Sequence, residues 1–287
     1  MRDLAAELTR LGHEVTVALP LDGGNVGQGD FPCRFLELPI ARGLALGQVL
    51  RLRQLMAAER FDIAHFHGAR AALYGRLAAA PMRTRPWVVF SIHGFATPYY
   101  AAPKRLVYLA LERALQRLTE RTICVARAEA EVFASYGLAP PERIRVVPYG
   151  IDVHRFSAPA SDSSALRAEL GVGEGPVVLT VCRLDVPRDF DSLLDAFCSV
   201  RADFAGARLL IVGDGPQRSQ VATKVRALGM AEAVQLIGFR RDVPELMALA
   251  DIYVLTSYGW EGYPISTLEA QAAGTPVVVT DAGGSAE

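Results

Sequence analysis

The sequence lacks a large net charge of either sign, because 30 lysine and arginine residues oppose 31 acidic residues and leave a formal charge of −1 over 287 residues. A protein without an overall positive field has no general attraction for nucleic acid, so any anionic ligand must be held by local groups. Hydrophobic residues make up 51% of the chain and charged residues 21%. This globular composition and the length suggest two domains.

Paired cysteines and long apolar runs are also lacking. The four cysteines, Cys33, Cys124, Cys182 and Cys198, include no CxxC pair. Cys124 and Cys182 lie in apolar runs, so we interpret the thiols as reduced, packed as small hydrophobic groups, and typical of a reducing cytosol. No apolar run reaches the ~20 residues of a membrane span, and we expect no signal peptide before the first helical pattern. The protein is therefore expected to be cytoplasmic.

Apolar strand patterns alternate with helical patterns along the chain. Strands are predicted over 14–19, 63–67, 87–93, 122–126, 143–148, 176–184, 207–213, 234–239, 252–257 and 276–281. Helices are predicted over 3–11, 46–59, 103–119, 127–136, 191–203, 216–228, 243–250 and 265–273. Several strands are apolar on both faces, as in sheets covered by helices on both sides. The repeated strand–helix–strand order indicates an α/β fold with parallel sheets.

A polar segment over residues 146–164, with Pro148, Gly150 and Pro159, indicates an interdomain linker. We predict one domain over residues 1–152 and a second over 153–287. The chain opens in a helix, whereas a doubly wound domain begins with a strand and a glycine-bearing turn. We therefore expect both domains to be incomplete.

Two arginines follow one predicted strand. Arg183 ends the strand over 176–184, and Arg188 lies five residues further on. Open α/β sheets bind ligands outside the carboxyl ends of their strands, and the arginine fork donates paired hydrogen bonds to phosphate. Two solvated surface arginines remain the alternative on spacing alone.

The stretch EGYPISTLE places Glu261 and Glu269 on either side of a helix start. Pro264 suits the first helical turn, and the amides around Ile265 to Leu268 face a region that favours phosphate. Glu269 suits the hydroxyls of a ribose, and Glu261, in the loop, is free to face a sugar. A helix-start acid and a solvated helix acid are the alternative. The parallel sheet is expected to bring the upstream arginines to this stretch.

The run SYGWEGYPISTLEAQAAGTPVVVTDAGGSAE resembles the signature of glycosyltransferase family four. The segments RLDVPRDFDSLLDAF, LLIVGDGPQ, IGFRRDVPELMALADIYVLTS and VVPYGIDVHRF resemble the family as well, in matching order and spacing. The resemblance implies the GT-B fold, with two Rossmann-like, doubly wound domains facing a cleft. The first domain would serve the acceptor and the second the nucleotide-sugar donor. The first strand and the C-terminal helices of that fold are expected to be missing here.

The resemblance implies a bacterial, retaining enzyme of cell-envelope or polysaccharide biosynthesis. It would move a sugar from a UDP- or GDP-sugar to a hydroxyl of a carbohydrate, lipid-linked or small-molecule acceptor. The alternative is a truncated, inactive remnant that still binds a nucleotide. The expected place is the cytoplasm, or the inner face of the membrane if the acceptor is lipid-linked.

The family's functional residues can be carried over by position. Arg183 and Arg188 match the pair that neutralises the donor diphosphate, and Glu269 matches the acid that binds the ribose. Glu261 matches the acid that faces the donor sugar, and His93 is expected to contact that sugar from the other domain. The remaining donor-side positions are Gly262, Tyr263, Pro264, Ile265, Ser266 and Thr267 along the diphosphate and sugar, with Gly238, Phe239 and Arg240 against the base. Cys182 departs from the family pattern, which has glycine there.

Two patterns could hold a metal. The DxD triplet over residues 189–191 opens a helix, so an N-cap role for one of its acids is favoured. His65 and His67 share one strand face without an evident third ligand, so a cleft-edge or core role is favoured. We expect no metal cofactor, since arginines and a helix dipole would offset the phosphate charge.

Two further patterns are weaker. VGDGPQR lacks the third glycine of a dinucleotide fingerprint, so we interpret it as a turn and expect no NAD. The helix over 103–118 is amphipathic and basic. A core-facing helix with a solvated face is favoured there, and peripheral contact with an anionic membrane is the alternative.

Overall fold

The computed structural model describes residues 1–287 except 21–28, 30, 40–44, 95–96, 98–99, 158–162 and 186–187. It divides into two compact units. The first comprises Met1–His93, Ala102–Cys124 and Phe133–Arg145, and the second comprises Gly94–Ala101, Val125–Val132 and Val146–Glu287. The domain boundary between residues 152 and 153 stays a prediction.

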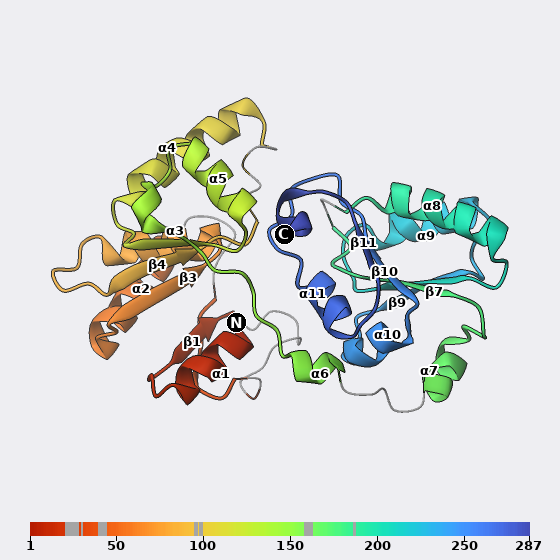
Figure 1. The fold of residues 1–287 in the computed structure, drawn as a ribbon. Coiled ribbons are helices and arrows are strands. Elements are labelled where there is room, and N and C mark those ends of the chain that lie inside the picture. Colours follow the sequence, from red (N-terminus) through yellow and green to blue (C-terminus); the bar gives the residue numbers. More distant parts are fainter. Residues whose placement is uncertain are drawn as a thin grey trace. The chain divides into compact units, whose positions relative to one another are not determined.

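A four-stranded sheet forms the core of the first unit (Figure 1). Its four strands run in the order β3 (Ile63–His67), β4 (Trp87–Ser91), β5 (Arg121–Cys124) and β6 (Ile144–Val146). A separate parallel pair joins β1 (Thr16–Leu19) to β2 (Arg34–Glu37). The helices are α1 (Arg2–Arg10), α2 (Leu46–Glu59), α3 (Ala69–Ala79) and α4 (Ala102–Gln116). Helix α5 (Arg127–Ser135) is divided between the units, with residues 127–132 in the second.

Helix α3 is held tightly between β3, α2 and α4. A Cβ atom on Gly75 would lie 2.2 Å from the ring of Phe66, so only glycine allows this approach of helix to strand. Arg76, on the same helix, is fully buried and forms a bidentate ion pair with Glu112 at 2.6 and 2.9 Å. Gln116 donates a further hydrogen bond to Glu112 at 2.8 Å. This satisfied polar network ties α3 to α4.

A five-stranded parallel sheet forms the core of the second unit, in the order β11-β10-β7-β8-β9. The strands are β7 (Val177–Val181), β8 (Arg208–Val212), β9 (Val234–Gly238), β10 (Ile252–Leu255) and β11 (Val277–Val279). The chain adds β8 and β9 on one side of β7 and then returns to place β10 on the other side. The order of strands therefore reverses at β7, which creates a topological switch point between β7 and β10.

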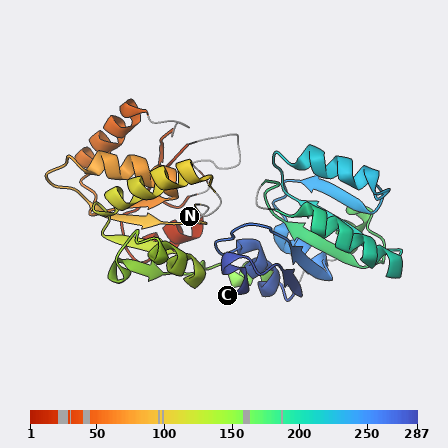
Figure 2. The same cartoon turned by 90° about the horizontal axis from the view of Figure 1, so that it is seen from above.

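Helices cover both faces of this sheet, as Figure 1 shows. Leu179, Leu210 and Tyr253 point to the face covered by α10 (Val243–Leu249) and α11 (Ile265–Ala272). Val178 and Ile211 point to the face covered by α8 (Phe190–Asp203) and α9 (Arg218–Ala227). Figure 2 shows α8 and α9 lying over the sheet when it is seen from above. Burial on both faces explains the continuous apolar strands of the sequence.

The predicted strands and helices are present, with most ends shortened by one to three residues. Among the described residues, two α-helical or strand elements of each unit were not predicted: β2 and α3 in the first, and α6 (Val153–Ser157) and α7 (Ser163–Leu170) in the second. Helix α6 corrects the interpretation of residues 146–164 as a linker throughout, because its Phe156 is buried and the helix packs on α10 and α11. All four cysteines are free, as expected. Among the described residues, no helix is both long and apolar enough to cross a membrane.

Candidate functional site

The switch point of the second unit brings an arginine and a glutamate together. Arg188 lies in the loop after β7, and Ser257 and Glu261 lie in the loop after β10. Arg188 Nη1 donates a hydrogen bond to Ser257 Oγ at 2.8 Å and forms an ion pair with Glu261 Oε1. The Ser257 hydroxyl donates to the same carboxylate oxygen at 2.7 Å. The expectation that the sheet brings Arg188 to the EGYPISTLE stretch is therefore confirmed.

Both partners of this ion pair are largely removed from water, since the side chains of Arg188 and Glu261 are 15% and 10% exposed. A buried charge needs a partner, and each of these groups compensates the other. The sequence assigned Arg188 to a phosphate and Glu261 to a sugar, and it did not predict their direct pairing.

Arg183 is not brought into this cluster. Its side chain is 82% exposed and forms an ion pair with Asp185 at 3.2 Å. An exposed ion pair of this kind contributes little stability, so the guanidinium can reorient toward an anion at low cost. Its role at a diphosphate stays a prediction.

Helix α11 begins just after Pro264, which stands at the N-cap and not in the first turn. The prediction placed Pro264 one residue too far into the helix. The amide of Thr267 is also not free as predicted, because it donates to the carbonyl of Pro264 at 3.2 Å. Ser266 pairs its hydroxyl with the Tyr253 hydroxyl at 2.7 Å, which anchors the helix start to β10.

Three buried polar atoms near this switch point have no hydrogen-bond partner: Arg188 Nε, Trp260 Nε1 and Thr267 Oγ1. Arg188 follows β7, Trp260 lies between β10 and α11, and Thr267 is in the first turn of α11. Buried polar groups in native proteins are nearly always bonded to protein or water, and each exception calls for an explanation. A polar ligand at the carboxyl end of β7 and β10 would supply the missing partners.

The remaining donor-side residues take different positions. Glu269 lies one turn into α11, close enough to Tyr253 to help raise the pKa of that phenol, although burial is the main cause. Gly238 ends β9 in the left-handed region, with φ of +74°, and Phe239 is 58% exposed. Arg240 is held by Asp242 at 2.8 and 2.5 Å and by Glu169 at 2.7 Å. These hydrogen bonds, first those with Asp242, raise the pKa of Arg240 and occupy its donors.

The first unit holds a cluster of three histidines. His67 ends β3, and its Nδ1 lies 2.9 Å from Nε2 of His93, two residues beyond β4. His65 Nε2 is 2.7 Å from Ser91 Oγ, and the His65 and His67 rings are 4.1 Å apart. The sequence did not foresee that His93 would join this pair. Among the described residues no group of three histidine, cysteine or acidic side chains has a geometry that could hold a metal ion.

The surroundings of these three rings favour the neutral form. Burial, the largest cause, lowers the pKa of His65 to about 4 and that of His67 to about 3, and it also lowers the pKa of His93. Neighbouring histidines and the amino group of Met1 add to these shifts for His67. Neutral rings can donate through one nitrogen and accept through the other.

A buried carboxylate fixes the backbone next to His93. Glu129 accepts hydrogen bonds from the amide of Gly94 at 2.8 Å and from the amide of Val125 at 2.9 Å. Burial raises the pKa of Glu129 to about 7, against the opposing effect of these two hydrogen bonds. The sequence offered no signal for this residue beyond its place in the first turn of a helix.

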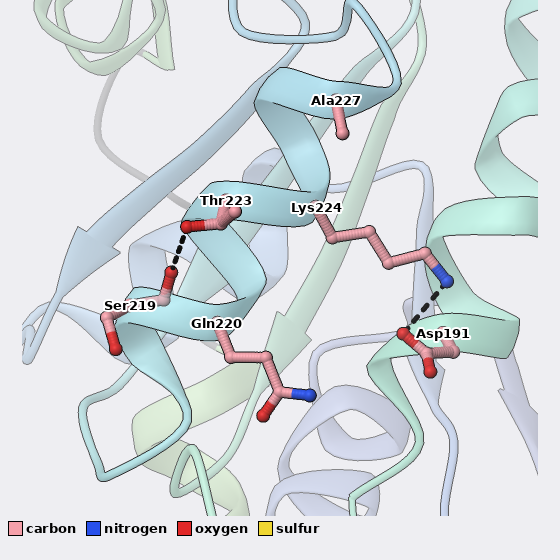
Figure 3. Close-up of a pocket in the computed structure, with 6 residues that line it drawn as sticks. All are labelled: Asp191, Ser219, Gln220, Thr223, Lys224 and Ala227. Atoms are coloured by element: carbon pink, nitrogen blue, oxygen red, sulfur yellow. Dashed lines mark hydrogen bonds and ion pairs between the residues drawn. The ribbon is translucent and has the colours of Figure 1, made fainter.

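The DxD triplet has the predicted structural role. Asp189 caps α8 by accepting a hydrogen bond from the amide of Ser192 at 3.0 Å. Asp191 binds Lys224 at 2.8 Å on the shallow pocket between α8 and α9 shown in Figure 3. Since the charged groups that line this pocket neutralise each other, it offers no free charge for a substrate.

Comparison with protein families matches residues 1–155 to Glycosyltransferase Family 4 and residues 175–287 to Glycosyl transferases group 1. The chain is 30% identical over 250 residues to UDP-Gal:alpha-D-GlcNAc-diphosphoundecaprenol alpha-1,3-galactosyltransferase of Escherichia coli, covering 83% of this chain and 62% of that protein. It is 29% identical over 246 residues to a GDP-mannose-dependent alpha-(1-6)-phosphatidylinositol monomannoside mannosyltransferase of Mycobacterium tuberculosis, covering 83% and 63%. The chain thus spans less than two thirds of the length of these relatives.

Solved structures agree with this result. HepE of Anabaena in complex with UDP-glucose has a TM-score of 0.79 at 25% identity, covering 99% of this chain and 77% of that one. WaaG, a glycosyltransferase involved in lipopolysaccharide biosynthesis, has a TM-score of 0.73 at 21% identity, covering 99% and 77%. These neighbours have the GT-B fold, so the predicted fold class is confirmed. Because the first family match covers more than half of its 287 residues, the chain belongs to glycosyltransferase family 4.

Proposed function

We propose that this chain transfers a sugar from a nucleoside diphosphate sugar to an acceptor hydroxyl, with retention of configuration. The observation that carries the proposal is the set of three unpartnered buried polar atoms in the loops after β7 and β10 and in the first turn of α11. The relatives support the donor class, since their names specify UDP-galactose and GDP-mannose. HepE was solved with UDP-glucose.

The donor diphosphate binds at the start of α11, beside Arg188. The unpartnered Nε of Arg188 faces the phosphate, and the exposed Arg183 swings from Asp185 to join it. Glu261 then exchanges its contact with Arg188 for hydroxyls of the sugar, while Ser257 keeps holding its carboxylate. Glu269 takes the ribose hydroxyls one turn further along α11.

The base rests against the end of β9. Gly238 allows the backbone to turn there, and the exposed ring of Phe239 offers an apolar surface. Arg240 supports this segment through Asp242 and Glu169 and does not contact the base, because those carboxylates occupy its guanidinium.

Catalysis follows from the charge that develops on the leaving diphosphate. The bond between the anomeric carbon and the phosphate oxygen breaks, and the acceptor oxygen bonds to the same face of that carbon. The proton of the acceptor hydroxyl passes to the departing phosphate. Arg183, Arg188 and the amides at the start of α11 stabilise the growing negative charge without a metal cofactor. Glu261 positions the sugar, and His93 contacts it.

We further propose a lipid-linked acceptor and peripheral contact with the inner face of the membrane. The name of the Escherichia coli relative specifies a diphosphoundecaprenol acceptor. Helix α4 exposes Leu106 and Val107, which are 66% and 69% accessible, beside Lys104 and Arg105. The sequence favoured a core-facing helix with a solvated face here, and the exposed apolar side chains instead favour an interfacial helix.

Nucleotide binding tests this proposal directly. The chain has two tryptophans, so replacing Trp87 by phenylalanine leaves Trp260 as the only indole reporter. We expect UDP or GDP to change its fluorescence at micromolar to millimolar concentration, and Arg188→Ala to weaken binding at least about tenfold. Arg226→Ala, an exposed arginine of α9, serves as the control and should bind as the parent does.

Turnover completes the test. Release of UDP from UDP-galactose or of GDP from GDP-mannose should require Glu261. A folded sample that binds neither nucleotide at millimolar concentration would contradict the proposal. Binding without any turnover would instead indicate a nucleotide-binding protein without catalysis.

A further inference from the structure

The register of the first sheet places four polar side chains on one face. His65 and His67 of β3 lie opposite Val89 and Ser91 of β4, and side chains two residues apart along a strand share a face. The backbone continues this pairing, because the amide of Gly68 donates to the carbonyl of Ser91 at 2.9 Å. His93 follows two residues after Ser91, and its ring therefore meets that of His67 at the carboxyl edge of the sheet.

Contacts on both sides restrain the two rings. The ring of His65 packs at 4.1 Å from the ring of His67, and Ser91 holds the His65 nitrogen. The backbone beyond His93 is fixed by Glu129, which accepts the amide proton of Gly94. The hydrogen bond between His67 Nδ1 and His93 Nε2, at 2.9 Å, closes this arrangement between two neutral rings.

One proton lies between two neutral imidazoles, and this constrains both tautomers. If His67 carries its proton on Nδ1, then Nε2 of His93 must accept, and the proton of His93 is on its own Nδ1. If His93 carries its proton on Nε2, then Nδ1 of His67 must accept, and the proton of His67 is on its own Nε2. The two rings must therefore have the same tautomer.

We propose that His67 is a positioning residue for His93. Through their hydrogen bond it holds the His93 ring in one orientation and determines whether the Nδ1 edge of that ring donates or accepts. The inference rests on the proposed contact between His93 and the transferred sugar. A sugar hydroxyl meets a preoriented partner of defined polarity, which lowers the ordering cost at the transition state.

The tautomers can be measured without a substrate. Long-range ¹H–¹⁵N correlation of the histidine rings at pH 7, with assignment by single variants, should show His67 and His93 as matching neutral tautomers in the 287-residue chain. In His67→Phe, which keeps an aromatic ring, we expect the His93 signals to shift toward a mixture of both tautomers. Opposite tautomers in the parent would overturn the proposal.

Turnover is measured with UDP-galactose and GDP-mannose as probes. His67→Phe should lower kcat about three- to tenfold, the equivalent of one net hydrogen bond, with little change in KM for the donor. His67→Asn, whose amide reaches the position of Nδ1, should recover most of this loss. His13→Phe, at an exposed histidine of the same unit outside this cluster, should retain kcat within about twofold.

The failure of this inference can be separated from the failure of the proposed function. If His93→Ala lowers kcat but His67→Phe does not, His67 does not position it and the proposal is overturned. If His93→Ala leaves kcat unchanged, His93 does not contact the sugar, and the proposal falls together with that part of the proposed function. A loss of kcat in His67→Phe that His67→Asn does not recover would also count against it.

Discussion

Replacing Glu261 by glutamine removes the charge that compensates Arg188 and nearly conserves the volume of the side chain. Water screens this pair weakly, since the two side chains are only 15% and 10% exposed. Removing one partner of a buried pair costs about 3–5 kcal/mol. The glutamine oxygen still accepts from Ser257, which retains about 1 kcal/mol. We therefore expect Glu261→Gln to lower the free energy of unfolding by roughly 2–4 kcal/mol.

The same substitution should have the opposite effect on nucleotide binding. In the parent the diphosphate must displace Glu261 from Arg188, whereas in Glu261→Gln it meets an uncompensated guanidinium. We expect UDP or GDP to bind about tenfold more tightly, a difference of about 1.4 kcal/mol. The nucleotide should therefore raise the melting temperature of the variant more than that of the parent. Sugar transfer should fall, because the carboxylate that receives the sugar hydroxyls is lost.

Urea unfolding and thermal scans with and without nucleotide measure both effects. Glu232→Gln, an exposed acid of the same unit, controls for the loss of one negative charge. The double variant Arg188→Met with Glu261→Gln should recover most of the stability and lose the tight nucleotide binding. A Glu261→Gln protein that is as stable as the parent, or that binds nucleotide more weakly, would refute the reasoning.

Three further predictions follow from other buried or exposed groups. The pKa of Glu129 is raised from 4.5 to about 7, so the stabilisation that comes from its protonated form is full below pH 4.5 and is lost as the pH rises through 7. Glu129→Gln should therefore flatten the pH dependence of the free energy of unfolding in urea between pH 4.5 and 7. Arg76→Ala should cost about 3–5 kcal/mol in the same assay. Arg76→Met with Glu112→Leu should cost less, about 1–3 kcal/mol, because only buried Gln116 then lacks its acceptor, and equal losses in both would contradict this. Leu106→Ser with Val107→Ser should weaken sedimentation with phosphatidylglycerol vesicles without changing UDP binding, and unchanged sedimentation would count against the membrane proposal.

Local patterns were sufficient for most elements of the fold. The ranges 46–59 and 63–67 agree with α2 and β3 at both ends, because the spacing of apolar residues that predicts a helix or a strand depends only on residues close in sequence. Helix α3 was missed because it is rich in small residues and buried on several sides, so it has no clear polar face. Strand β2 was missed because four residues carry too little periodicity.

The sequence by itself determined the α/β class, the family resemblance and the capping role of Asp189. These follow from signals within short stretches, and the order of strands and helices was enough to bring Arg188 to the loop of Glu261. Only the tertiary structure decided which groups touch. The pairing of Arg188 with Glu261 and of His67 with His93 depends on side-chain direction at the ends of neighbouring strands, since sheet register and the reversal at β7 join residues that are distant in sequence. The neighbours in space also decide whether an arginine can turn to a ligand. Asp242 and Glu169 hold the side chain of Arg240, whereas the side chain of Arg183 lies largely in solvent.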